Sequence, residues 1–229
     1  MLLESKLRNL FLQNPDVLYG FTGIGYSPYA KAYRSALVFA VPYGIPLALG
    51  TYQESALHQG IQQAKENTES ILRQVADILQ KDQVRYWIPP AAQENETELL
   101  ALFSFKTAAV HAGLGWIGKN DVLISEKYGP RVRLSAVLID AEFEYGQPVT
   151  ASKCPVDCTS CIDVCPCGAL KNRLWTIDAQ RDELIDFQKC NRMRSASIEK
   201  LGRKNECGLC MAACPYGLQA DICAIQEEN

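Results

Sequence analysis

The residues most able to do chemistry are ten cysteines, all between Cys154 and Cys223 in a chain of 229 residues. A first block reads CPVDCTSCIDVCP and a second reads CGLCMAACP. Both end in Cys-x-x-Cys-x-x-x-Cys-Pro, the spacing of bacterial ferredoxins, in which the last cysteine of each run binds the other cluster. Zinc ribbons use separated Cys-x-x-Cys pairs without these endings. The pattern therefore predicts two iron–sulfur clusters, both of the [4Fe–4S] type.

Each cluster needs four thiolates, and the two blocks with one cysteine between them provide eight. The thiolates expected at the first cluster are Cys154, Cys158, Cys161 and Cys214. Those expected at the second cluster are Cys165, Cys190, Cys207 and Cys210. Two further cysteines, Cys167 and Cys223, remain as spare thiols. Either could replace Cys154, which lies one residue too far from Cys158 for the ferredoxin pattern, or Cys190, which lies between the blocks.

Composition and charge narrow the class of protein. Hydrophobic residues make up 48% of the chain and charged residues 21%, which allows a packed core. The formal net charge of −3 argues against nucleic acid as the main partner. No apolar run reaches the roughly 20 residues that span a bilayer, and the N-terminus lacks a signal peptide or twin-arginine leader. We therefore expect a cytoplasmic protein that does not use a membrane, in which clustered cysteines are metal ligands rather than disulfides.

The elements that must position these cysteines form an α+β body ahead of them. Helical periodicity or composition marks three segments, 1–20, 53–80 and 96–112. Strands are expected at 35–44, 84–90, 122–125 and 131–140. The composition changes near 147–153, which predicts a body domain over 1–147 and a cysteine-rich domain over 148–229. Arg131, on a face of the last strand, is expected at the surface or at an interface, with a cofactor contact as the alternative.

A glycine-rich segment, HAGLGWIGKN, lies between the body and the cysteines. Gly113, Gly115 and Gly118 match G-x-G-x-x-G, but the segment does not follow a strand in a βαβ unit and contains Trp116. On local sequence alone, a tight turn between a helix and a strand is favoured.

Several motifs in a fixed order resemble one family. AVHAGLGWIGKNDVLIS, then YGPRVRLSAVLID, then the two cysteine blocks resemble the epoxyqueuosine reductase and reductive dehalogenase group over about residues 30–220. Members of this group are cobalamin-dependent iron–sulfur enzymes with a nitroreductase-like domain followed by a two-cluster ferredoxin-like module. The resemblance implies that fold here, and it supports Cys190 as a ligand. The chain is expected to be a short, double-cluster relative without the helical repeats that grip tRNA in some members.

The resemblance also implies a cobalamin beside the glycine-rich segment. The glycines would let the backbone approach the macrocycle, Trp116 would pack on it, and Lys119 and Asn120 would bond its polar edge. The implied cofactor-binding residues are Gly113, Leu114, Gly115, Trp116, Gly118, Lys119 and Asn120. A flavin in the same fold is the alternative cofactor.

The leading hypothesis is an iron–sulfur oxidoreductase whose two clusters pass electrons to a cobalamin that reduces an unidentified substrate. Its expected partners are a small-molecule substrate or a corrinoid protein, and an electron donor such as ferredoxin or flavodoxin. In epoxyqueuosine reductases an acidic proton donor precedes the glycine motif, whereas this chain has Leu99 there, with Glu96 and Glu98 as neighbours. The catalytic residue is thus unassigned, and this difference motivates the alternative of an electron-transfer protein or corrinoid-activating reductase without substrate chemistry of its own.

Overall fold

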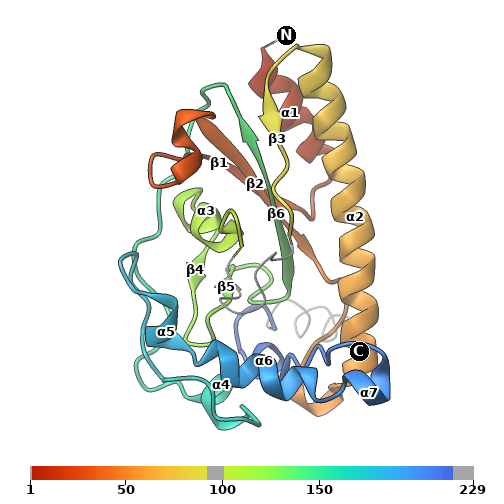
Figure 1. Ribbon diagram of the computed structural model, residues 1–229, viewed down its shortest axis with the longest axis vertical. Helices are drawn as coiled ribbons and strands as arrows, with labels where there is room; N and C mark the ends of the chain where they lie inside the picture. Colours follow the sequence, from red (N-terminus) through yellow and green to blue (C-terminus); the bar gives the residue numbers. More distant parts are fainter. Residues whose placement is uncertain (1, 92–100, 219–229) are drawn as a thin grey trace, which may run out of the picture. The chain divides into compact units, whose positions relative to one another are not determined.

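The structure, a computed structural model, describes residues 2–91 and 101–218. Two compact units are present, and each is built from separate segments of the chain (Figure 1). The first unit comprises Met1–Pro42, Ala64–Leu114 and Arg133–Val149. The second comprises Tyr43–Gln63, Gly115–Val132 and Thr150–Asn229. In the described ranges no helix combines the length and apolar character needed to cross a membrane.

The first unit contains a four-stranded sheet in the order β1-β2-β6-β3. Its strands are β1 (Leu18–Gly23), β2 (Ser35–Pro42), β3 (Tyr86–Trp87) and β6 (Val132–Ile139). β1 pairs antiparallel with β2, and β3 pairs antiparallel with β6. β2 is buried along nearly its whole length, because its apolar run SALVFAVP is an inner strand covered on both faces.

Three helices contribute to this unit. In α1 (Leu3–Leu12) the buried side chains are Leu7, Leu10 and Phe11, which share one face of the helix. α3 (Phe105–His111) begins at Ser104, whose hydroxyl accepts a hydrogen bond from the N–H of Thr107 at 3.2 Å. The long helix α2 (Glu54–Lys81) begins in the second unit and continues into the first. A short 3₁₀ helix of this unit spans Pro28–Lys31, and another, Leu49–Thr51, belongs to the second unit.

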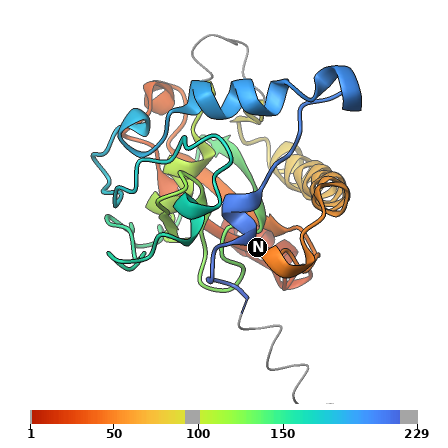
Figure 2. The same cartoon turned by 90° about the horizontal axis from the view of Figure 1, so that it is seen from below.

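The second unit consists mainly of short elements joined by irregular chain, as the teal-to-blue C-terminal segment shows (Figure 2). β4 (Trp116–Ile117) and β5 (Leu123–Ile124) form a small antiparallel sheet. The helices are α4 (Ser160–Asp163), α5 (Arg181–Leu184), α6 (Phe187–Ser195), α7 (Ile198–Leu201) and α8 (Leu209–Ala212). One apolar cluster in this unit is centred on Leu47, Leu57 and Ala212. Such short elements need polar contacts to fix their loops.

The sequence predicts most of the regular elements correctly. The mixed α and β class, the strand at 35–44, the helix at 53–80 and the strand at 131–140 are confirmed. The helix expected over 1–20 is wrong beyond Leu12, because Pro15 within a turn breaks the helix and residues 18–23 pair with β2. The helix expected over 96–112 starts only at Phe105 in the described part, and Glu96, Glu98 and Leu99 lie outside the described residues.

The structural units differ in one respect from a simple division of the chain. The chain enters the second unit for the last time between Val149 and Thr150, inside the boundary expected at 147–153. Two earlier segments, 43–63 and 115–132, also belong to the second unit. They do so because their side chains contact the cysteine loops, as described below. The division into 1–147 and 148–229 remains a prediction about domains.

Candidate functional site

The first cysteine quartet surrounds one cavity in the second unit. The cavity is lined by Cys154, Cys158, Cys161 and Cys214, together with Lys119 and Asn120. Burial raises the pKa of the Cys161 thiol to about 12 and that of Cys214 to about 11. For Cys161 the electrostatic effects of Cys154, Cys214 and Cys158 add to the increase, in that order. The structure therefore brings together the four residues that the spacing assigns to the first cluster.

The second quartet is grouped around Cys210. Burial raises the pKa of the Cys210 thiol to about 12, and the electrostatic effects of Cys207, Cys161, Cys190 and Cys165 raise it further. The pKa of Cys190 is also raised, first by burial, and Cys207 and Cys165 are among its neighbours. The four residues assigned to the second cluster thus lie near one another. Cys161 and Cys210 lie where the two quartets meet.

One of the two spare thiols lies beside the second quartet. The Sγ atoms of Cys165 and Cys167 are 3.9 Å apart, and the pKa of Cys167 is raised to about 11, mainly by burial. Burial also acts to raise the pKa of Cys165, but hydrogen bonds, including one from the N–H of Ala169 at 3.3 Å, outweigh it and lower that pKa. Exchange between Cys167 and a neighbouring ligand stays open. Cys223 lies outside the described residues.

The number and spread of the thiols bear on the kind of metal centre they could hold. Within ranges 2–91 and 101–218, no three His, Cys, Asp or Glu side chains converge closely enough to hold one metal ion. A zinc site needs such convergence, because each sulfur lies about 2.3 Å from the ion. A [4Fe–4S] cluster instead takes one thiolate at each iron, which spreads the sulfurs around it. Four thiols line one cavity, which is the number of thiolates that one [4Fe–4S] cluster takes.

Two buried cations hold the backbone of the first quartet. Lys119, with 2% of its surface exposed, donates from Nζ to the carbonyl oxygens of Val156 at 2.8 Å and Cys158 at 2.9 Å. Arg131 is 6% exposed, and its Nη2 donates to the carbonyl oxygen of Cys214 at 2.9 Å. Its Nη1 and Nε donate to the carbonyl oxygens of Tyr216 at 2.6 Å and Leu47 at 2.8 Å. Both cations therefore reach the main chain of a predicted ligand.

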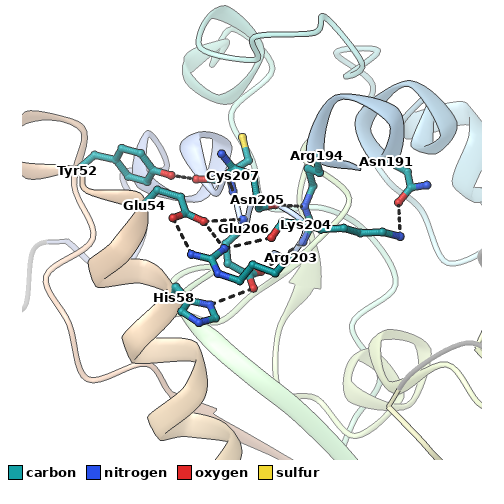
Figure 3. A network of polar contacts seen from close by, with 10 residues as sticks. All are labelled: Tyr52, Glu54, His58, Asn191, Arg194, Arg203, Lys204, Asn205, Glu206 and Cys207. Carbon is teal, nitrogen blue, oxygen red and sulfur yellow. Dashed lines mark hydrogen bonds and ion pairs between the residues drawn. The ribbon is translucent and has the colours of Figure 1, made fainter. Parts of the chain in front are cut away.

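Neutral side chains hold the corresponding carbonyls of the second quartet. The amide Nδ2 of Asn120 donates to the carbonyl oxygen of Cys210 at 3.2 Å. The hydroxyl of Tyr52 donates to the carbonyl oxygen of Cys207 (Figure 3). Asn120 also lines the cavity of the first quartet, so one side chain contacts both groups of cysteines.

A polar network anchors the loop before Cys207 to the start of α2 (Figure 3). The carboxylate of Glu54 accepts hydrogen bonds from Arg203 at 2.6 and 2.9 Å and from the N–H of Glu206 at 3.0 Å. The guanidinium of Arg203 is the largest of the effects that lower the pKa of Glu54 to about 2. The Glu206 carboxylate lies 3.5 Å from Nδ1 of His58 and 3.3 Å from Nη2 of Arg194. This network fixes the approach to the second quartet.

The glycine-rich segment is divided between the two units. Gly113 and Leu114 belong to the first unit, where their N–H groups donate to carbonyls of α3, and the residues from Gly115 onward belong to the second. A Cβ atom on Gly115 would lie 2.1 Å from the carbonyl oxygen of Ile124, so this glycine allows the chain's own backbone to approach. Trp116, 1% exposed, packs edge-on against Tyr216 with ring centroids 4.9 Å apart.

The cobalamin contacts that the resemblance implies for this segment remain a prediction, and its side chains also have partners within the chain. The side chains of Lys119 and Asn120 bond carbonyls of the cysteine loops, and Gly118 lies against Asn120 and Ile124 of the same segment. In the structure, Lys119 and Asn120 therefore support the backbone of the two cysteine quartets. The local motif does not predict these hydrogen bonds, because the carbonyl groups that accept them lie 37 to 90 residues further along the chain.

Some contributors to the site are absent from the sequence-based assignment. Arg131 was expected at a surface or an interface, but it is buried because all three of its donor groups point at backbone carbonyls. Tyr52 and Glu54, at the start of α2, lie far from the cysteines in the sequence and follow no recognisable motif. His58 pairs with Glu206, whereas His111 stacks on Tyr26 with ring centroids 4.2 Å apart.

Comparisons with known proteins identify relatives of part of this chain. The epoxyqueuosine reductase of Cyclobacterium marinum is 32% identical over 118 residues, which cover 47% of this chain and 35% of that protein. That of Lactococcus garvieae is 35% identical over 109 residues, covering 47% of this chain and 30% of the relative. The chain thus spans about a third of the length of these curated relatives. No family model matches the chain.

Solved structures share the fold at low sequence identity. A catabolic reductive dehalogenase, NpRdhA, in complex with 3-bromo-4-hydroxybenzoic acid has a TM-score of 0.68 and 18% identity, covering 92% of this chain and 31% of that one. The epoxyqueuosine reductase from Bacillus subtilis has a TM-score of 0.61 and 18% identity, covering 94% and 65%. Another epoxyqueuosine reductase is similar with a TM-score of 0.58 and 17% identity over 94% and 65%, and its structure holds a tRNA-Tyr stem loop.

The fold is therefore that of the reductive dehalogenase and epoxyqueuosine reductase structures. The curated relatives named above are epoxyqueuosine reductases. The family resemblance predicted from the motifs is confirmed.

Proposed function

We propose that this chain is an iron–sulfur oxidoreductase that holds two [4Fe–4S] clusters and passes electrons to a corrinoid that reduces a substrate. The observation that carries the proposal is the grouping of eight cysteines into two adjacent quartets, the first of them around one cavity. The clusters, when bound, supply single-electron transfer. The relatives' identity as reductases supports the same class of activity.

The chain's own residues would build and protect this electron path. Burial keeps Cys161 and Cys214 away from water, which limits side reactions and solvent access at the first quartet. Lys119 and Arg131 orient the main chain of Cys158 and Cys214, and Asn120 and Tyr52 orient that of Cys210 and Cys207. Cys161 of the first quartet lies near Cys210 of the second, so the two cluster sites are adjacent. The proposed domains are a nitroreductase-like body and a ferredoxin-like module.

The corrinoid is proposed on the family resemblance, and its proposed contacts are Gly113, Leu114, Gly115, Trp116, Gly118, Lys119 and Asn120. A reductive dehalogenase of the same fold is described in connection with B12-dependent dehalogenation, with a TM-score of 0.66 and 18% identity over 92% of this chain and 31% of that one. A flavin is the alternative cofactor. The proposed partners are a ferredoxin or flavodoxin as donor and a small molecule or corrinoid protein as acceptor, in the cytoplasm.

A second candidate function is electron transfer to a partner, including activation of a corrinoid protein, without substrate chemistry in this chain. The engagement of Lys119 and Asn120 with the cysteine loops favours it, because these contacts support the cluster sites that electron transfer requires. Both functions need the two clusters, so they share the same metal content and differ in cofactor binding.

The test is anaerobic purification followed by iron and sulfide analysis and a cobalamin titration of the same sample. About eight iron atoms per chain and saturable cobalamin binding would support the corrinoid reductase. The same iron content without cobalamin binding would favour the electron-transfer function, and a bound yellow chromophore would favour the flavin. Zinc in place of iron would contradict both functions. Tight binding of a tRNA stem loop would contradict the expectation that nucleic acid is not a partner.

A further inference from the structure

The two cysteine quartets share a sequence pattern but differ in the charge of the side chains that hold them. Lys119 and Arg131 bring two positive charges to carbonyl oxygens of the first quartet, at Cys158 and Cys214. Both side chains are more than nine-tenths buried. Tyr52 and Asn120, which are neutral, donate to the carbonyl oxygens of Cys207 and Cys210 of the second quartet.

Charged residues also lie near the second quartet, and its arginines are paired with carboxylates. Lys204 and Lys189 donate to the neutral oxygens of Asn191 and Gly168, but both lysines are less buried than Lys119 and Arg131. Arg203 forms two hydrogen bonds with Glu54, and Arg194 lies 3.3 Å from Glu206 (Figure 3). Arg181, whose electrostatic effect reaches Cys190, lies 3.4 Å from the carboxylate of Asp121. Each pair cancels most of its own field at a distance.

A one-electron reduction adds one negative charge to a cluster, and the surroundings decide how much that charge costs. Net charge, hydrogen bonding and solvent exposure set the reduction potentials of iron–sulfur clusters over a wide range. A buried cation stabilises nearby negative charge strongly, because little water intervenes to screen it. The reduced form is therefore favoured more in the first quartet than in the second.

We infer that Lys119 and Arg131 tune the reduction potential of the first quartet and make its cluster the more readily reduced of the two. This inference rests on the proposed function, since it requires both clusters. The difference in reduction potential would also give electron transfer between the two clusters a direction. An electron from a one-electron donor of the ferredoxin or flavodoxin class would leave the reduced second cluster, which returns to its oxidised form, and would reduce the first.

The test is a redox titration of the anaerobically purified, cluster-containing protein, followed by electron paramagnetic resonance. Lys119→Gln, which keeps a donor but removes the charge, should shift the midpoint potential of one cluster to a more negative value and leave the other nearly unchanged. Lys119→Arg, which keeps the charge, is the matched control and should shift it much less. Tyr52→Phe removes a neutral donor at the second quartet and should leave the more positive midpoint in place. Equal midpoints for wild type and Lys119→Gln would overturn the inference.

A second measurement keeps the inference testable if the Lys119 variants lose iron. Cys190→Ser removes a predicted ligand of the second cluster only, so the cluster that remains intact is the first. Its midpoint should match the more positive of the two wild-type values, and a match to the more negative value would overturn the inference. Failure of the proposed function is distinguishable from either result, because wild-type protein would then contain no iron–sulfur cluster to titrate.

Discussion

The two cysteine quartets show how one spacing motif is supported in two physically different ways. At the first quartet, two buried cations donate to the carbonyls of Cys158 and Cys214. At the second, Tyr52 and Asn120 do so without charge, and a network around Glu54 fixes the preceding loop (Figure 3). The comparison teaches that the ligand spacing determines where thiols meet, whereas residues remote in sequence determine the electrostatic environment of each group.

The largest effect that separates the quartets should come from removing one ligand. Cys161→Ser removes a thiol that burial holds beside three others, and we expect about four of about eight iron atoms per chain to be lost. The cluster of the second quartet should remain. Cys167→Ser is the matched control and should retain the full iron content, because Cys167 is predicted to be a spare thiol. If Cys167→Ser lost iron and Cys190→Ser retained it, Cys167 would be the cluster ligand and Cys190 the spare thiol.

The next largest effect should come from removing the guanidinium beside the first quartet. Arg131→Met leaves the carbonyls of Leu47, Tyr216 and Cys214 without their buried donor, and we expect a loss of about 3 kcal/mol in the free energy of unfolding. Urea unfolding measured by circular dichroism would give this value. Arg192→Met, at an exposed position, should change stability by less than about 0.5 kcal/mol. Similar losses in the two variants would show that Arg131 does not support the quartet.

A smaller and pH-dependent effect is expected at the network before Cys207. The pKa of Glu54 is lowered to about 2 from 4.5, mainly by Arg203, so its folded-state pKa lies below the unfolded value. The stability that Glu54 contributes is thus present above about pH 4.5 and is lost as the pH falls towards 2. Glu54→Gln should be about 1–2 kcal/mol less stable than wild type at pH 7. Denaturant unfolding across this range should show the difference narrowing in acid; a constant difference would mean that ionisation of Glu54 is irrelevant.

The smallest effect is expected for the neutral donor at the second quartet. Tyr52→Phe removes the hydroxyl that donates to the carbonyl of Cys207, and we expect the free energy of unfolding to fall by about 1 kcal/mol. The absorbance of the second cluster should decay faster in air, with that of the first unchanged. Tyr26→Phe, in the first unit, serves as a control and should not alter either decay. Equal decay in wild type and Tyr52→Phe would show that Tyr52 does not protect the second cluster.

The sequence predicts the thiols and the main elements well because their signals are local. The apolar run at 35–44 and the periodicity at 53–80 determine a strand and a helix by themselves, and the cysteine spacing groups residues that the fold then brings together. Pro15 is also a local signal: it indicates a turn, and the helix does end before it, at Leu12. In these places local physical chemistry was sufficient.

The supports of the quartets could not be predicted because each depends on partners distant in the chain. Arg131 meets Leu47 and Cys214, which are 84 residues before it and 83 residues after it. An arginine directly before a strand usually lies in solvent, so only the fold shows that Arg131 is buried. Lys119 and Asn120 belong to the motif that resembles a cofactor loop. No local pattern predicts their contacts with Val156, Cys158 and Cys210.

The most direct test of the central claim is electron paramagnetic resonance of the dithionite-reduced protein, compared with Cys161→Ser and Cys190→Ser. Two adjacent clusters should give a broadened, spin-coupled spectrum in the wild type, and each substitution should leave the simpler spectrum of a single reduced cluster. Identical spectra for the two variants, or a wild-type spectrum of one isolated cluster, would contradict the assignment of the eight cysteines to two quartets.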